Sequence, residues 1–155
     1  MAKKGKAKKR KIVLASGVFD LLHLGHVKFL EEAKKAGGRD ADLVVIVARD
    51  STVRKRKGKN PIFSENQRRA LVESLKVVDE AVLGFENFDL GKVVEKIKPD
   101  VIALGHDQVD MEKAVLRYLQ ERSLAINVVR IDKFSLDELD SSSKIKERIV
   151  EDFRR

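Results

Sequence analysis

Residues 12–26 read IVLASGVFDLLHLGH, and this stretch decides the fold. Its apolar run at residues 12–15 has the length and composition of a buried strand. A helix is expected over residues 24–35, with Gly37 and Gly38 behind it as C-terminal stop signals. Two of the chain's three histidines, His23 and His26, lie where this helix begins.

The alternation of apolar runs and amphipathic stretches continues along the chain. Residues 43–48 (LVVIVA) are nearly all apolar and β-branched, so we expect them to form the central strand, buried on both faces. Further strands are expected at residues 81–83, 101–104 and 126–131, and further helices at residues 64–75, 89–97, 111–122 and 141–153. A basic, glycine-containing loop is expected at residues 54–59. The pattern predicts an α/β fold, a doubly wound five-stranded parallel sheet of Rossmann-like type. Its ligand should lie at the carboxyl ends of the strands, where the strand order reverses.

Charge is distributed unevenly along the 155 residues. The first eleven residues hold seven Lys and Arg and no acidic residue, while the rest has 26 basic against 25 acidic residues. We therefore expect a disordered basic tail at residues 1–11 and one domain at residues 12–155. Such a tail binds nucleic acid weakly through phosphate contacts, or serves only as a solvated extension. Apart from this, no nucleic-acid partner is expected.

Targeting signals and cysteine are missing from the sequence. No apolar run approaches the roughly 18 residues that a membrane span needs, and the N-terminus lacks the pattern of a secretory signal. With no cysteine, disulfides and thiolate metal sites are excluded. We expect a cytoplasmic protein with no membrane partner.

Residues 17–26 fit the pattern G-x-F-D-x-x-H-x-G-H, which arises by chance in fewer than about one in ten million windows. The last four residues open a helix, and a helix N-terminus attracts anions through its free N–H groups and partial positive charge. His23 and His26 are three positions apart, so both rings can face one side and donate to phosphate oxygens. Gly25 lets the backbone approach a nucleotide closely. The pattern predicts a phosphate cradle, whereas a single such histidine would more often be a capping or core residue.

The pattern resembles that of the cytidylyltransferase-like nucleotidyltransferases, the H-x-G-H family that includes glycerol-3-phosphate cytidylyltransferase, phosphopantetheine adenylyltransferase and archaeal FAD synthase. The resemblance extends over residues 12 to about 150, with further landmarks at residues 65–68, 78–80, 100–107 and 141–145. Residues 47–50, 57–62 and 104–108 are most similar to archaeal FAD synthases. The acidic segment 132–140 lacks the arginine of the cytidylyltransferases and the cysteine pair of the archaeal FAD synthases.

The resemblance implies an enzyme that transfers a nucleoside monophosphate to a phosphorylated acceptor and releases pyrophosphate. It favours ATP and FMN as substrates, with FAD as product. CTP with glycerol 3-phosphate is the alternative pair, and a non-catalytic nucleotide- or RNA-binding module is the alternative class. The implied cofactor is Mg²⁺ or another divalent cation carried by the nucleotide, with no metal site on the protein. Family members are often dimers, so a homodimer is an expected state.

The resemblance also implies roles for individual residues. The predicted catalytic residues are His23, His26, Lys57 and Arg68. The predicted nucleotide-binding residues are Gly17, Val18, Phe19, Asp20, His23, Leu24, Gly25, His26, Asp107, Phe134, Ser142 and Ser143.

Four of these predictions have simple structural alternatives. Arg68 lies at a helix start, where a cation opposes the helix dipole unless an anion is nearby, and it is otherwise a surface arginine. Lys57 is otherwise an exposed loop residue, and Asp107 a turn residue, as His106 beside it is expected to be. Helix capping would explain one of Ser142 and Ser143 without any ligand.

Overall fold

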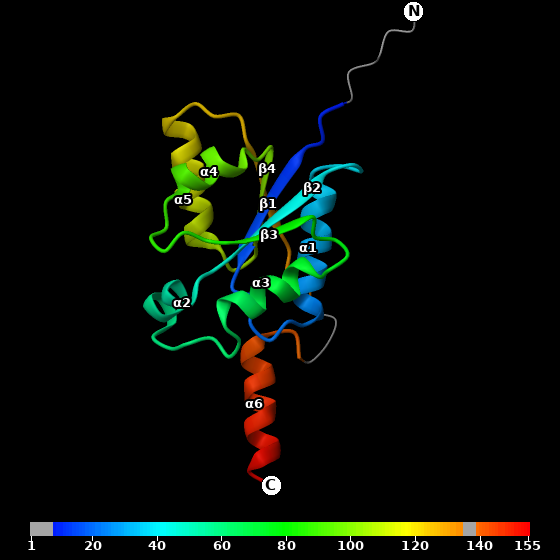
Figure 1. Ribbon diagram of the computed structural model, residues 1–155, viewed down its shortest axis with the longest axis vertical. Helices are drawn as coiled ribbons and strands as arrows, with labels where there is room; N and C mark the ends of the chain where they lie inside the picture. Colours follow the sequence, from blue (N-terminus) through cyan, green and yellow to red (C-terminus); the bar gives the residue numbers. More distant parts are fainter. Residues whose placement is uncertain (1–7, 135–138) are drawn as a thin grey trace, which may run out of the picture.

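The computed structural model describes residues 8–134 and 139–155, which form a five-stranded, all-parallel sheet covered by helices (Figure 1). The strands are β1 (Ile12–Gly17), β2 (Asp42–Val47), β3 (Glu80–Leu83), β4 (Val101–Gly105) and β5 (Asn127–Ile131). The helices are α1 (Leu24–Ala36), α2 (Asp50–Lys57), α3 (Glu65–Glu73), α4 (Leu90–Ile97), α5 (Val109–Glu121) and α6 (Ser142–Phe153). The predicted doubly wound fold is confirmed.

The strand order is β3-β2-β1-β4-β5, with every neighbouring pair parallel. The middle strand is therefore β1, and the prediction that residues 43–48 form the central strand is wrong. Its composition did not distinguish the two, because β2 is also an interior strand with a neighbour on each side. The chain runs outward from β1 through β2 and β3, and then returns to the other side of β1 with β4. The order thus reverses between β1 and β4, which places the expected ligand site at their carboxyl ends.

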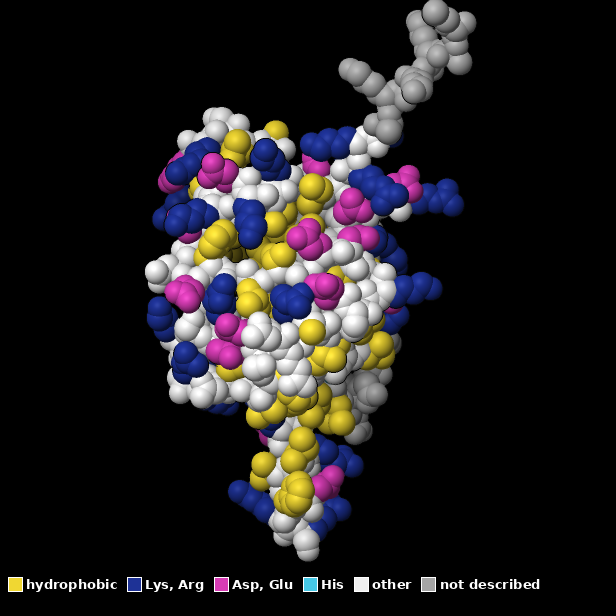
Figure 2. Space-filling view, in the orientation of Figure 1, with side chains coloured by type: hydrophobic (Ala, Val, Ile, Leu, Met, Phe, Trp, Pro, Cys, Tyr) yellow, Lys and Arg dark blue, Asp and Glu magenta, His cyan; other side chains and the backbone are white. Residues whose placement is uncertain are grey.

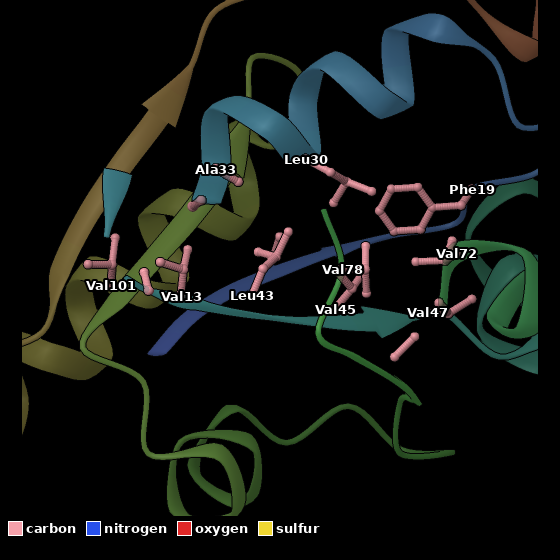
Figure 3. Close-up of a cluster of buried hydrophobic side chains, with 14 residues drawn as sticks. Val13, Phe19, Leu30, Ala33, Leu43, Val45, Val47, Val72, Val78 and Val101 are labelled. Atoms are coloured by element: carbon pink, nitrogen blue, oxygen red, sulfur yellow. The ribbon is translucent and has the colours of Figure 1, made fainter. Parts of the chain in front are cut away.

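Two apolar clusters fill the two faces of the sheet. On one face, Val13 and Ala15 of β1 pack with Leu30 of α1 and Val72 of α3 (Figure 3). On the other face, Leu14 packs with residues of α4 and α5. Successive β1 side chains alternate between the two faces, as the pleat of a strand requires. Helices on both sides hold β1 rigidly, so the loop that follows it has a fixed base.

Residues 54–59 were expected to form a loop, and this prediction is wrong for most of them. They belong to α2, and the helix ends at Gly58 in the left-handed region with φ 70°. Lysine and arginine are good helix formers, and the four basic residues 54–57 lie in the last turn, where the helix dipole favours cations. Gly58 then supplies the left-handed C-terminal cap.

The two ends of the chain differ in structure. Residues 1–7 of the predicted basic tail lie outside the described residues, and residues 8–11 are exposed with no regular structure. At the other end, α6 runs away from the body of the molecule (Figure 1). Within the part of the chain that the structure describes, no helix has the length and apolar character needed to cross a membrane.

Candidate active site

The paired histidines lie where the loop after β1 passes into α1, at the carboxyl end of the middle strand. His23 is the N-cap of α1, and its Nδ1 accepts a hydrogen bond of 3.1 Å from the Gly25 backbone N–H. In return, the backbone N–H of His23 donates to Nδ1 of His26 at 3.2 Å. The two rings stack with centroids 3.8 Å apart and planes at 27°. The prediction that both rings face one side is confirmed.

These bonds also determine which ring nitrogen carries the proton. A neutral imidazole has one acceptor and one donor nitrogen, and both Nδ1 atoms are acceptors here. Each ring therefore carries its hydrogen on Nε2, the nitrogen that the helix cap leaves available. The histidines combine the predicted capping role with a pair of adjacent N–H donors.

The protonation state of the pair follows from burial. Burial, together with the neighbouring His23, lowers the pKa of His26 to about 4, although the Asp20 carboxylate acts in the opposite direction. Burial also lowers the pKa of His23, against the raising effect of Asp140. At neutral pH both rings are uncharged, so they can stack without repulsion and each can donate from Nε2.

The lowered pKa of His26 predicts a loss of stability in acid. Its pKa of about 4 lies below the ordinary 6.5, so the unfolded chain binds more protons between these values. The stabilisation is fully present above pH 6.5 and declines as the pH falls to 4. The full loss is about 3 kcal/mol, since one pKa unit corresponds to about 1.4 kcal/mol. Urea unfolding of the wild type and His26→Asn at several pH values measures it, and parallel pH profiles for the two proteins would contradict the assignment.

Two glycines make room for rings of the site. A Cβ on Gly25 would lie 2.9 Å from two atoms of the His23 ring and 3.2 Å from the carbonyl oxygen of Asp140. A Cβ on Gly17 would lie 2.9 Å from the ring of Phe19. Gly25 is therefore required by the stacked histidines themselves, a reason separate from the predicted approach of a nucleotide.

Phe19 supports the histidines from within the core. Its side chain is buried among apolar residues, near Leu30 and Val72 in Figure 3, and the backbone has φ 55°, which is unusual for a residue with a side chain. Its ring meets that of His26 edge-on, with centroids 5.4 Å apart. The core covers this ring, and the predicted contact of Phe19 with nucleotide stays a prediction.

Asp20 ties the histidine loop to the segment before α3. Its buried carboxylate accepts hydrogen bonds from the backbone N–H groups of Ile62 and Phe63, at 2.7 and 2.9 Å. Lys146 of α6 lies 3.9 Å from the same carboxylate. Since both oxygens hold protein backbone, the structure gives the Asp20 side chain a positioning role in place of the predicted nucleotide contact.

Arg68 is the most buried charged side chain of the described residues, with 0% exposure. Its guanidinium donates to the backbone carbonyls of Val18, Ala48 and Phe63 at 2.7–3.0 Å, and to Oδ1 of Asp50 at 2.7 Å. It thereby joins the loops after β1 and β2 to the starts of α2 and α3. Both predicted readings are corrected: Arg68 is neither a surface residue nor placed to contact phosphate, because protein acceptors occupy its donors. The anion that offsets the helix dipole is Asp50.

The start of α6 meets the histidine loop directly. The N-cap is Ser141, whose Oγ accepts from the backbone N–H of Lys144. The Ser142 hydroxyl donates to the carbonyl oxygen of Asp20, so capping does not account for either predicted serine. Ser143 is exposed beside them.

A lysine cluster at the same place was missed from the sequence. Lys144 and Lys133 hold their Nζ atoms 2.7 and 3.7 Å from the carboxylate of Asp140, which is nearly buried and acts electrostatically on His23. The sequence carried a signal for it, since Lys144 directly follows the three serines at residues 141–143. The cluster adds two half-exposed cations near the histidine pair.

Four other predicted residues have exposed side chains on segments that follow strands of the sheet. Leu24 opens α1, and Lys57 closes α2 with its side chain exposed. Asp107 stands with His106 in an exposed turn after β4, and Phe134 follows β5 and is 38% exposed. Their contacts with a ligand stay predictions.

Within residues 8–134 and 139–155, no group of three or more His, Cys, Asp or Glu side chains is arranged to hold a metal ion. The cations of the site are instead lysine ammonium groups, and its neutral donors are the histidine Nε2–H groups.

The geometry defines the class of protein. Paired neutral N–H donors at a helix start, beside half-exposed lysines and at the point where strand order reverses, form a binding site for phosphate groups. No side chain of the pair is set up as a nucleophile, so the site suits direct transfer between phosphates. These are the features of a nucleotidyltransferase.

Comparison with known proteins identifies the family. Residues 14–148 match the model of the cytidylyltransferase-like family, and the chain belongs to it. An FAD synthase of Methanothermus fervidus is 52% identical over 136 residues, which cover 88% of this chain and 92% of the relative. An FAD synthase of Ferroglobus placidus is 56% identical over 140 residues, which cover 90% and 88%. The predicted family is confirmed, and the chain is a nucleotidyltransferase.

Solved structures agree with the fold. A protein of Thermoplasma volcanium described as a lipopolysaccharide core biosynthesis protein superimposes with a TM-score of 0.74 at 48% identity, covering 82% of this chain and all of the other. A pantoate-beta-alanine ligase of Francisella tularensis gives a TM-score of 0.61 at 14% identity, covering 97% and 74%. The second likeness shows the fold alone.

Proposed function

We propose that this chain is an FAD synthase, which transfers AMP from ATP to FMN and releases pyrophosphate. The observation that carries the proposal is the roughly half identity, over nearly the whole chain, to several archaeal relatives named FAD synthase. The site supports it, because the two neutral histidines and the neighbouring lysines can bind several phosphate groups at once.

The reaction needs positioning and charge stabilisation. A phosphate oxygen of FMN attacks the α-phosphorus of ATP, a new P–O bond forms, and the bond from the α-phosphorus to the bridging oxygen of pyrophosphate breaks. The Nε2–H groups of His23 and His26 donate to oxygens of the transferring and leaving phosphates, where negative charge develops. Because both rings are neutral, they act as hydrogen-bond donors and need not lose a proton.

Cations compensate the phosphate charge. Nucleotidyltransferases of this family generally act on a nucleotide that carries a divalent cation. We infer that this cation is Mg²⁺, held by the phosphates of the nucleotide. Lys57 at the end of α2 and Lys144 at the root of α6 are proposed to supply positive charge to the phosphates. Such pre-placed charge lowers the reaction barrier without reorganisation.

The remaining predicted residues would contact the nucleoside and the flavin. Asp107 after β4 is proposed to accept from the nucleoside, and the exposed side chains of Leu24 and Phe134 offer apolar surface. Ser143 is free of the N-cap role and is proposed to donate to a phosphate. A cytoplasmic location remains an expectation from the sequence.

The test is pyrophosphate release by the purified protein with Mg²⁺, using ATP or CTP crossed with FMN or glycerol 3-phosphate. Release with ATP and FMN only is expected, with FAD identified by chromatography. Release with CTP and glycerol 3-phosphate would instead make the chain a cytidylyltransferase. Silence in all four mixtures, with salt-sensitive RNA binding that is lost when residues 1–11 are removed, would support the non-catalytic module.

A further inference from the structure

The two strands at the middle of the sheet diverge before they end. The pairing of β1 with β4 stops at Ala15 and Ala103. Beyond this point β1 continues to pair with β2 as far as Gly17, and β4 continues to pair with β5 as far as Gly105. The divergence lies at the carboxyl ends of β1 and β4, which is the place where a doubly wound sheet binds its ligand.

The side chain of Gln108 spans the point where these strands diverge. Its Oε1 accepts from the backbone N–H of Gly105 at 2.8 Å, and its Nε2 donates to the carbonyl oxygen of Ser16 at 3.4 Å. The backbone N–H of Gln108 also donates to the carbonyl oxygen of Gly105 at 3.1 Å. A glutamine amide has the donor and the acceptor of a peptide group. It therefore joins β4 to β1 one residue beyond their last pair on β1, in place of a bond between the strands.

The start of α5 does not account for this glutamine. Gln108 is the N-cap of α5, and among the described residues its side chain makes no capping bond. The preferred N-cap residues are serine, threonine, aspartate and asparagine, whose short side chains reach the first turn of the helix. The amide of Gln108 is directed instead at the sheet, so its role concerns the two strands.

The two strands that Gln108 joins lead to different parts of the proposed site. The loop after β1 leads to the paired histidines, which are proposed to donate to phosphates. The turn after β4 carries Asp107, which is proposed to accept from the nucleoside. A Cβ on Gly105 would lie 3.0 Å from Oδ1 of Asp107, so this carboxylate packs against the residue that Gln108 holds. The bonds of Gln108 to Gly105 and Ser16 thus connect the phosphate side to the nucleoside side.

We propose that Gln108 is a positioning residue that sets the spacing between the phosphate site after β1 and the nucleoside site after β4. The proposal rests on the proposed function, in that the nucleotide lies across the ends of these two strands. A nucleoside triphosphate must meet both sides at once, whereas an inorganic polyphosphate meets the histidine side alone. Small errors in position are costly when two groups must be held together. Affinity for the whole nucleotide therefore depends on Gln108, and affinity for polyphosphate does not.

The experiment is isothermal titration calorimetry of the full chain with Mg²⁺ and either ATP or inorganic tripolyphosphate. Gln108→Met keeps the length of the side chain and removes both bonds of the amide. It should raise Kd for ATP at least about tenfold and change Kd for tripolyphosphate less than about twofold. Gln108→Asn is the second variant, since asparagine is a preferred N-cap residue but is too short to reach both strands. It should give the same loss of ATP affinity with the start of α5 retained.

The matched control is Gln120→Met, at an exposed glutamine near the other end of α5, which should leave both Kd values unchanged. Circular dichroism checks that each variant is folded. All proteins are compared at one concentration and should share one sedimentation coefficient. This check is needed because hydrophobic side chains gather along α6 (Figure 2), and association of chains there would change the measured heats.

Equal losses of affinity for ATP and tripolyphosphate would overturn the proposal, because Gln108 would then support the phosphate site itself. Unchanged ATP affinity in Gln108→Met or Gln108→Asn would also overturn it. Failure of the proposed function is a separate result, since ATP binding is measured without FMN and turnover is measured with it. If the wild type binds CTP in place of ATP, the same comparison with CTP decides the proposal. A wild type that binds neither nucleotide would overturn both.

Discussion

His23→Asn is expected to leave the stability of the protein unchanged within about 0.5 kcal/mol and to lower kcat/KM for pyrophosphate release by about 100- to 1,000-fold. Asparagine is among the preferred N-cap residues, and its side-chain oxygen can take the place of Nδ1 as acceptor from the Gly25 N–H. Its shorter side chain has no group at the position of Nε2. The variant therefore removes the donor to phosphate while it retains the start of α1.

The measurement is steady-state pyrophosphate release together with urea unfolding of the same preparation. His106→Asn is the control, because His106 lies in an exposed turn after β4, and it should keep nearly full activity. His23→Gln should recover part of the activity, since its amide N–H reaches toward the Nε2 position, although it weakens the cap. If His23→Asn lost stability and activity in proportion, the ring would be structural and the proposed transfer mechanism would need another donor.

The fold was predictable because its strands are marked by composition. The buried runs at residues 12–15, 43–48 and 101–104 are apolar on both faces, and each became an interior strand of the sheet. The position of a strand within the sheet was not predictable in the same way. Both β1 and β2 have neighbours on each side, and burial alone does not show which of them lies in the middle.

The basic stretch at residues 54–59 shows a second limit. A glycine and several cations suggested a loop, yet the cations are good helix formers and the glycine is the cap that ends α2. The same residues that were read as a loop form the last turn and the cap of a helix. What was missing was the support of the first turn, where Glu65 accepts from the backbone N–H of Asp50 across 15 residues of sequence.

The site was predictable where function depends on local spacing. The interval between His23 and His26 sufficed to predict that their rings lie together, because the helix geometry sets it. Arg68 and Asp20 lie in separate motifs with bonding partners far away in sequence, and only the folded chain shows that backbone groups occupy their side chains. The resemblance suggested a phosphate contact for Arg68 and a nucleotide contact for Asp20, whereas the long-range contacts make both side chains supports of the site.

Arg68→Met is expected to lower the free energy of unfolding by about 3–5 kcal/mol, a large share of the stability of a typical domain. Removal of the guanidinium leaves the carbonyls of Val18, Ala48 and Phe63 without this donor, and Asp50 without its cation. Buried acceptors that lose their partner keep the cost of desolvation and gain nothing in return. Arg68→Lys should recover only part of the loss, since one ammonium cannot reach four acceptors in three directions.

Arg69→Met is the matched control on the same helix. Arg69 is partly exposed and pairs with Glu73 one turn along α3, so its replacement should cost less than about 1 kcal/mol. Urea unfolding compares the variants, and KM for ATP is measured in Arg68→Lys under conditions where it remains folded. A phosphate-binding Arg68 would give a raised KM with stability near that of the wild type. If Arg68 is instead a buried structural support, Arg68→Lys lowers the free energy of unfolding. Activity then falls only because the loops after β1 and β2 are no longer held at their positions around the histidines.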